Sequence, residues 1–311
     1  MTKSKWILPT LVAVTVFVMG NAFADGQVKT VFVIVDENEN WADISASEMP
    51  YLKKTLIPMG GYAKQYYNPP GLHPSEPNYI WLEAGDNLGL LTDKEPSVSN
   101  SINTTQHLVT YLKNAGISWK AYQEGIPGTD CPLSKIGEYV PKHNPFIFFQ
   151  DVTDNNDSGS VYCISHMRPL TELFSDLKDN TVARYNFITP DLCNDMHDTC
   201  SATVSSQKMA DNWLRRVVPK ILNSKAFKDG GALFITWDEG EGVDPAGQRS
   251  DGPIGLIVVS PLAKVNYTNT IHYTHSSLLR TLEEIFGITP LLRDSAKASS
   301  LSDLFTQEAL K

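Results

Sequence analysis

The sequence predicts an α/β fold, a three-layer α/β/α sandwich built on a mostly parallel central sheet. Two observations support this fold class. Short apolar, β-branched runs alternate with segments of helical length along the 311 residues, a pattern typical of a sheet covered by helices on both faces. The composition, 41% hydrophobic and 20% charged, is that of an ordinary globular protein and does not indicate disorder, collagen or a coiled coil.

The predicted strands are apolar runs, and continuous ones such as residues 31–35 favour burial on both faces. They cover residues 31–35, 117–122, 183–188, 232–237 and 255–259. The predicted helices, several of which end near glycine or proline, cover residues 49–57, 107–115, 169–177, 205–222 and 276–286.

The remaining long stretch, about residues 125–165, has little periodicity and many Pro, Gly, Asp and Asn residues. We interpret it as an irregular insertion over the sheet edge that rims a site. The sequence shows no repeat, linker or low-complexity block. Residues 25–311 are therefore predicted to form a single domain.

The first 24 residues have the pattern of a secretory signal peptide. Lys3 and Lys5 precede an apolar run over 6–19, and Ala22 and Ala24 occupy the positions that signal peptidase reads, so we expect cleavage after Ala24. The alternative, a membrane anchor, is disfavoured because the run is short for a span and contains Pro9. The sequence thus predicts a periplasmic or secreted protein without a stable membrane anchor.

The acidic charge balance argues against nucleic acid as a partner. The formal charge is −9, and it becomes about −11 without residues 1–24, because that segment holds two lysines and no acids. Binding to a phosphate backbone needs clustered Lys and Arg residues, and no such cluster occurs. A small anionic substrate remains compatible if a metal ion supplies local positive charge.

Four cysteines remain, an even number that suggests two disulfides in an exported chain. Of the three pairings, the simplest joins Cys193 to Cys200 and Cys131 to Cys163. The alternative, a cysteine-rich metal site, lacks CxxC spacing.

Polar clusters follow three predicted strands. They are Asp36-Glu37-Asn38, then Thr189-Pro190-Asp191 with Asp195 and His197, and Asp238-Glu239-Gly240. One acid after a strand is usually a cap or a turn residue. Three clusters at one sheet edge are harder to explain in this way, because ligands of α/β sheets bind beyond the carboxyl ends of strands. Converging carboxylates repel each other unless a cation neutralises them, so we expect a divalent metal.

A candidate nucleophile, Ser75, lies in the segment HPSEPNY, residues 73–79. It directly precedes an expected helix with Pro77 near its first turn, where free N–H groups stabilise an alkoxide and a phosphate. The alternative is an ordinary N-cap serine. Three histidines, His143, His197 and His275, are candidates to bind phosphoryl oxygens or to protonate a leaving group; taken singly, each fits a surface or capping residue.

Together these residues resemble the bacterial phosphoesterase family of acid phosphatases and phospholipases C, within the alkaline phosphatase superfamily. The likeness covers nearly all of residues 25–311, in order. It comprises Glu37-Asn38, the turn Ser75-Glu76-Pro77-Asn78, the segment Lys142-His143-Asn144-Pro145-Phe146, Thr189-Pro190-Asp191 with Asn194-Asp195-Met196-His197, Thr236-Trp237-Asp238-Glu239-Gly240, and His275-Ser276-Ser277-Leu278-Leu279-Arg280.

The resemblance implies an alkaline phosphatase-like fold and a role for each site residue. Ser75 would be the nucleophile, and Glu37, Asn38, Asp238 and Glu239 would hold one divalent metal ion, either Ca, Mg, Mn, Zn or Fe. His143 and His197 would contact phosphate as catalytic and substrate-binding residues, and Asn38 and His275 are also expected to bind substrate. The family often has two acids at the position of Asp238-Glu239, which makes Glu239 the looser match.

Three functions are compatible with this pattern. The leading one is an exported acid phosphatase that cleaves small phosphate monoesters through a phosphoseryl intermediate. A phospholipase C or another phosphodiesterase would use the same residues with different pocket walls. An exported binding protein with an inactive site is a different class, disfavoured because the nucleophile, acids and histidines are all present.

Overall fold

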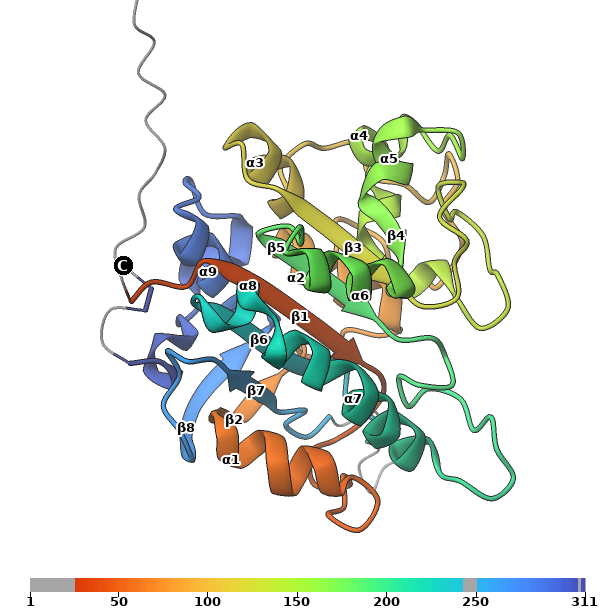
Figure 1. Cartoon of the computed structure of the whole chain (residues 1–311). Coiled ribbons are helices and arrows are strands. Elements are labelled where there is room, and N and C mark those ends of the chain that lie inside the picture. Colours follow the sequence, from red (N-terminus) through yellow and green to blue (C-terminus); the bar gives the residue numbers. More distant parts are fainter. Residues whose placement is uncertain (1–25, 243–250, 307–308, 311) are drawn as a thin grey trace, which may run out of the picture.

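The computed structural model describes residues 26–242, 251–306 and 309–310, so the predicted signal peptide lies outside the described residues. An eight-stranded sheet crosses the molecule in the order β4-β3-β5-β1-β6-β7-β2-β8 (Figure 1). Among these strands β7 is antiparallel to both neighbours, and the remaining pairs are parallel. The strands are β1 (Thr30–Asp36), β2 (Gly61–Tyr67), β3 (Trp119–Gln123), β4 (Met167–Pro169), β5 (Tyr185–Thr189), β6 (Gly231–Trp237), β7 (Leu256–Val259) and β8 (Tyr267–Thr274).

Helices cover both faces of the sheet. Helices α2 and α9 lie on one face, and α6, α7 and α8 lie on the other (Figure 1). This confirms the predicted fold with its mostly parallel sheet. The helices are α1 (Ile57–Met59), α2 (Ser75–Ala84), α3 (Leu108–Asn114), α4 (Gln150–Thr153), α5 (Val161–His166), α6 (Leu170–Asp179), α7 (Ser206–Asn223), α8 (Lys225–Lys228) and α9 (His275–Phe286), with short η helices at Leu52–Leu56, Pro141–His143, Pro145–Phe148, Arg293–Lys297 and Leu301–Leu304.

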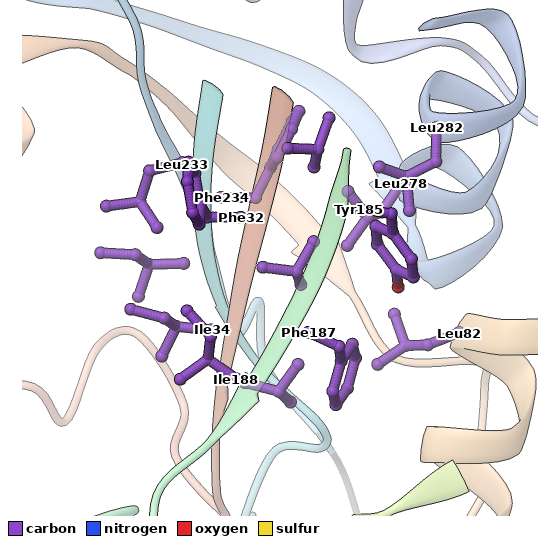
Figure 2. Close-up of a cluster of buried hydrophobic side chains, with 14 of the residues drawn as sticks. Phe32, Ile34, Leu82, Tyr185, Phe187, Ile188, Leu233, Phe234, Leu278 and Leu282 are labelled. Atoms are coloured by element: carbon purple, nitrogen blue, oxygen red, sulfur yellow. The ribbon is translucent and has the colours of Figure 1, made fainter. Parts of the chain in front are cut away.

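The core forms where apolar strand residues meet the inner faces of these helices. Strand β6 is buried along its whole length, which explains its continuous apolar sequence. Figure 2 shows Leu82 of α2 and Leu278 and Leu282 of α9 beside Tyr185 and Phe187 of β5. This packing fixes α2 against the central strands and thereby places its first residue at the carboxyl edge of the sheet.

Each predicted strand and helix is present, with ends that shift by a few residues. Three strands were not predicted from the sequence pattern. Strand β8 lies at the sheet edge and is mainly exposed or half-buried, and β4 has three residues. Strand β2 begins at Gly61, directly after a helix that ends at Met59, so the pair of glycines there marks a turn into a strand.

The irregular insertion contains short helices and no strand among residues 125–165. Both predicted disulfides are present, Cys131–Cys163 within this insertion and Cys193–Cys200 after β5. The four aromatic and aliphatic residues 146–149 are fully buried, so the insertion is anchored in the core although its sequence lacks periodicity. No helix in the described ranges has the length and apolarity needed to cross a membrane.

Candidate active site

The predicted polar clusters meet at the carboxyl edge of the sheet. Strand β1 lies between β5 and β6, and its last residue, Asp36, pairs with Trp237 of β6. Glu37 therefore directly follows β1, and Asp238 directly follows the adjacent strand β6. The Glu37 N–H donates to the Asp195 carbonyl at 2.7 Å, which brings the segment after β5 to the same place. The parallel sheet thus gathers side chains that are about 200 residues apart in the chain.

Ser75 is the first residue of α2, and its side chain is directed at Glu37. Its Oγ donates to Glu37 Oε2 at 2.9 Å, and both side chains are buried. The N-cap position belongs to Pro74, so the hydroxyl of Ser75 does not serve as the cap of its own helix. The structure therefore places Ser75 at a helix N-terminus, as the sequence predicted. It also brings the Ser75 hydroxyl into contact with a carboxylate.

His143 lies between two buried carboxylates. Its Nε2 is 3.2 Å from Glu37 Oε1, and its Nδ1 is 3.1 Å from Asp195 Oδ2. Burial opposes the charged imidazolium, but Glu37 and Asp195 outweigh it and raise the pKa of His143 to about 9. Burial likewise opposes the Glu37 carboxylate, but His143 lowers the pKa of Glu37 to about 2. These opposite shifts describe one ion pair, which the stacked ring of Tyr79 covers at 5.3 Å.

His197 lies at the rim of the same cluster. Its ring centroid is 5.6 Å from that of His143, and its backbone N–H donates to Asp195 Oδ1. Its Nδ1 is 2.7 Å from Asp198 Oδ1, and its Nε2 is 3.0 Å from Lys142 Nζ. The structure thus brings His143 and His197 together, as the sequence predicted, and adds a lysine that the sequence analysis did not assign.

Asp238 and Asn38 occupy the opposite side of Glu37. The Asn38 backbone has a φ of 50°, a left-handed conformation that asparagine tolerates better than most residues, and its N–H donates to Asp238 Oδ1 at 3.2 Å. Asp238 Oδ2 is buried without a partner in the described part of the chain. Burial, reinforced by Glu37 and Glu239, raises the pKa of Asp238 well above its usual value.

Glu239 has a different environment from Asp238. Its Oε2 accepts from Asn78 Nδ2 at 2.7 Å and lies 2.9 Å from His73 Nδ1. The other nitrogen of His73 is 2.8 Å from Asp251 Oδ2. Hydrogen bonds to Asp251 and Glu239 raise the pKa of His73 to about 9. Glu239 is therefore tied to the segment HPSEPNY through His73 and Asn78.

His275 begins α9 behind Asp238. It is fully buried, with Nε2 2.5 Å from the Asp238 carbonyl oxygen and Nδ1 3.0 Å from the Tyr66 hydroxyl. Burial lowers the pKa of His275 to about 4, which leaves a neutral ring. Both nitrogens are engaged, so a direct contact with substrate would require one of these bonds to break. That role stays a prediction, and the geometry gives His275 the position of a support for Asp238.

The donors at this edge fit a divalent cation. Glu37, His143 and His197 each offer a ligand atom, and these atoms lie within 4.8 Å of one another. In the described residues, Glu37 Oε1, His143 Nε2 and Asp238 Oδ2 are buried without a hydrogen-bond partner. Buried polar atoms are rarely left unpaired without a reason, and oxygen with imidazole ligands suits Mn, Fe or Zn, while the carboxylates also suit Mg or Ca. Of the predicted ligands in the described residues, Asp238 presents an oxygen without a hydrogen-bond partner, and Glu37 presents one whose contact is the ion pair with His143.

Sequence reasoning missed several site residues. Lys142 directly precedes His143, and His73 directly precedes Pro74-Ser75. Their position next to a predicted site residue is the signal that could have identified them. Asp195 was recognised only as part of an acid cluster, although it supports His143. Asp251 follows no predicted strand and had no sequence signal; it meets His73 through tertiary structure alone.

The chain matches the family model described as "Phosphoesterase family" over residues 33–289. It is 30% identical over 234 residues to a phosphate-repressible acid phosphatase from Penicillium chrysogenum, covering 74% of this chain and 53% of that protein. It is 28% identical to a phosphatidylinositol-3-phosphatase from Mycobacterium tuberculosis, covering 88% and 82%. The chain spans 53% to 62% of the length of the fungal acid phosphatases that it matches.

Solved structures with the same architecture share little sequence with the chain. A member of the alkaline phosphatase superfamily from Vibrio parahaemolyticus aligns with a TM-score of 0.59 at 11% identity, over 90% of this chain and 72% of that one. Murine ectonucleotide pyrophosphatase/phosphodiesterase 5 aligns with a TM-score of 0.56 at 11% identity, over 89% of this chain and all of that one. At this identity the likeness shows the fold.

Proposed function

The chain belongs to the phosphoesterase family, and from this premise we propose that it is an exported, metal-dependent phosphatase that hydrolyses small phosphate monoesters. One observation carries the proposal. The Ser75 hydroxyl donates to Glu37 at the N-terminus of α2, beside His143 and beside carboxylate oxygens that lack hydrogen-bond partners. A nucleophile, cations and a metal-compatible donor set thus meet at one buried edge.

Ser75 Oγ attacks phosphorus, the bond between phosphorus and the leaving oxygen breaks, and the leaving oxygen takes up a proton from solvent water. Glu37 Oε2, 2.9 Å from Oγ, orients the hydroxyl and holds its proton during the attack. The positive N-terminal end of α2 stabilises the developing negative charge, although the Glu76 N–H is bonded to Asp93 and Pro77 has no N–H. Water then attacks the phosphoseryl intermediate, and Oγ leaves and regains its proton.

The two histidines serve the phosphoryl group and the leaving oxygen. His143, held as a cation between Glu37 and Asp195, offsets charge on the equatorial oxygens. His197 is more exposed than His143, at 26% against 2%. Its Nδ1 is bonded to Asp198 and its Nε2 to Lys142, so it would reach the leaving oxygen after one of these bonds breaks. Proton transfer by a positioned side chain typically raises the reaction rate by about 10²–10⁴-fold.

Glu37 and Asp238 would hold the metal, with Asn38 and Glu239 beside them. When bound, a divalent cation would supply positive charge to the phosphoryl oxygens and would lower the pKa of the serine hydroxyl. The chain's own residues keep the carboxylates in place: Asn38 N–H binds Asp238, and His275 supports the Asp238 carbonyl.

A monoester is favoured over a diester because of the relatives. The acid phosphatase and phosphatidylinositol-3-phosphatase relatives, both monoesterases by name, match at 30% and 28% identity, whereas a phospholipase C from Mycobacterium tuberculosis matches at 22% over 57% of the chain. Turnover of a chromogenic phosphate monoester and of a choline phosphodiester separates the alternatives. Cleavage of the diester alone would favour a phospholipase C, and a binding protein with an inactive site would cleave neither.

Export is part of the same proposal. Both disulfides join residues of the folded domain, and such bonds persist in oxidising compartments. Expression of the full chain in a bacterium, followed by N-terminal sequencing of the periplasmic product, tests this point. A mature N-terminus at Asp25 is the expected result, and retention of Met1 in the cytoplasm would contradict export.

A further inference from the structure

Lys142 is a partly buried cation at the edge of the candidate site. It lies in the short helix Pro141–His143, directly before His143, and 16% of its side chain is exposed. Its Nζ is 3.1 Å from Asp93 Oδ2 and 3.0 Å from His197 Nε2. An ammonium group has three N–H donors, and in the described residues these two partners are the ones it contacts by hydrogen bonding.

The contact with His197 fixes which nitrogen of that ring carries the proton. An ammonium group donates and cannot accept, so His197 Nε2 must present its lone pair to Lys142. The proton of the neutral ring then lies on Nδ1, which donates to Asp198 at 2.7 Å. In this arrangement the positive charge nearest to the His197 ring belongs to Lys142.

The charge of the site favours such a cation. Five carboxyl groups are buried there, those of Asp36, Glu37, Asp195, Asp238 and Glu239. A phosphate monoester is itself anionic, so it would be repelled by uncompensated carboxylates. Lys142 directly precedes His143, and its Nζ lies 3.0 Å from His197 Nε2, so its ammonium group lies beside this group of carboxylates.

We propose that Lys142 binds the phosphoryl group directly, using its remaining N–H donor, and that Asp93 and His197 hold the ammonium in place for this contact. The inference rests on the proposed function and adds a substrate-binding residue to it. A hollow of about 280 Å³ is lined by Lys142 together with Asp93, Glu95 and Lys135, so the partly exposed Lys142 side chain borders open space at the edge of the site.

Asp93 links this cation to the nucleophile helix. While its Oδ2 accepts from Lys142, its Oδ1 accepts from the Glu76 N–H at 3.0 Å. Glu76 follows Ser75 in the first turn of α2. Lys142 is thereby fixed relative to the residue that attacks phosphorus, as a contact to a transferred phosphoryl group demands.

The test measures affinity for inorganic phosphate, both as competitive inhibition of turnover and by calorimetry with the Ser75→Ala chain, at a saturating concentration of the divalent cation that supports activity. Lys142→Met should weaken phosphate binding by about tenfold to a hundredfold, the range for a hydrogen bond to a charged group. Lys135→Met is the matched control, because Lys135 lines the same hollow but is exposed; it should leave the affinity within about twofold of wild type.

A second comparison separates direct binding from positioning of His197. If Lys142 contacts phosphate itself, Lys142→Met should weaken binding further in a His197→Ala background. If Lys142 only orients His197, the double variant should bind phosphate as His197→Ala does, and the inference is overturned. Equal affinity of Lys142→Met and wild type would overturn it too. Should Lys142→Met fail to fold, Lys142→Gln removes the charge while it keeps a donor for Asp93.

The proposed function and this inference fail in different ways. A wild-type chain that binds phosphate through Lys142 but hydrolyses no ester would contradict the function and leave the anion contact standing. A wild-type chain that turns over a monoester, with unchanged phosphate affinity after Lys142→Met, would contradict the inference alone.

Discussion

Helix α2 meets a buried histidine between two carboxylates at each of its ends. Near its N-terminus, His143 lies between Glu37 and Asp195, at 3.2 and 3.1 Å; we call these three residues the Glu37 cluster. Near its C-terminus, His107 lies between Glu83 and Asp151, at 2.9 and 3.0 Å; these form the Glu83 cluster. Each imidazole also stacks on an aromatic ring, His143 on Tyr79 and His107 on Phe149.

The clusters differ in how fully their polar atoms are bonded. In the Glu83 cluster, the Val109 N–H donates to Glu83 and the Thr110 hydroxyl donates to Asp151, which leaves Glu83 Oε2 as its one unpartnered atom in the described residues. In the Glu37 cluster, Glu37 Oε1 and His143 Nε2 face each other at 3.2 Å as an ion pair without a hydrogen bond, and in the described residues the neighbouring Asp238 Oδ2 has no hydrogen-bond partner. The same residue types are thus more fully hydrogen-bonded at the C-terminal end of α2 than at its N-terminal end.

The largest expected effect tests the Ser75 hydroxyl, which donates to Glu37 of the Glu37 cluster. Ser75→Ala removes the nucleophile and should reduce turnover by more than about 10²-fold, since the remaining groups cannot form the covalent intermediate. Steady-state kinetics with a chromogenic monoester, together with circular dichroism, measure activity and folding. Retention of more than about a tenth of wild-type turnover would show that Ser75 is not the nucleophile.

Ser205→Ala is the control for a serine that caps a helix away from the site, where its hydroxyl also donates to Glu48. The Ser205 side chain accepts from the Lys208 N–H at the start of α7. Its loss should lower the free energy of unfolding by about 1 kcal/mol and leave turnover unchanged.

The second effect compares the same substitution at the two histidines, His143 and His107. His143→Gln should lower kcat by about 10²-fold or more, because it removes a cation beside the transferred group. His107→Gln should instead destabilise the fold by about 3 kcal/mol, because it leaves buried carboxylates without their partner. Kinetics and urea denaturation of both variants measure the contrast. If His107→Gln, measured at a temperature where it is folded, lost as much kcat as His143→Gln, then the assignment of His143 to turnover and His107 to stability would be wrong.

The third effect concerns metal. Chelation should lower turnover at least about tenfold, and added divalent cation should restore it; Asp238→Asn should reproduce the chelated state because it removes a ligand charge. Asp151→Asn, in the Glu83 cluster, should leave the sensitivity to chelator unchanged. Metal analysis of wild type and Asp238→Asn provides the direct measurement. Equal metal content in the two proteins would move the site away from Asp238.

The strands were predictable where an apolar run in the sequence corresponds to a strand buried on both faces. Strands such as β1 and β6 are buried on both faces, so their apolar runs predict them. Strand β8 lies at the edge and its residues are mainly exposed or half-buried, so its sequence carries no apolar run. The antiparallel direction of β7 depends on its connections, which hydrophobic patterning does not encode.

The site was predictable where residues follow strands and less so where tertiary contacts decide. Glu37 and Asp238 follow adjacent parallel strands, and the sheet brings them together. Lys142 acquires its place through Asp93 and His197, which lie 49 and 55 residues away in the chain. No local pattern distinguishes His143 from His107 either, because each owes its carboxylate partners to other elements.

The smallest expected effect is a pH dependence of stability that originates in the Glu83 cluster. Burial opposes the charge of His107, but Asp151 and Glu83 outweigh it and raise its pKa above 6.5. The folded chain then binds more protons than the unfolded chain in the window that opens near 6.5, so the contribution of His107 is complete below that pH and is lost as pH rises. Burial raises the pKa of Glu83, which has the same sign, because stability falls as pH rises above 4.5.

Asp151 has the opposite sign and sets the acid limit. Burial opposes its charge, but His107 lowers its pKa below 3.8, so its contribution is lost as pH falls through the acid range. The difference in Tm between wild type and His107→Gln should therefore be largest near about pH 5.5 and shrink by about 2 °C or more at pH 9, since about 1 kcal/mol shifts Tm by a few degrees in a chain of this size. Scanning calorimetry of both proteins measures it, with the exposed His272→Gln as control. A Tm difference that grows from pH 5.5 to pH 9 would mean that His107 is neutral in the folded chain. The two ends of α2 would then differ in the charge of their histidines as well as in their hydrogen bonding.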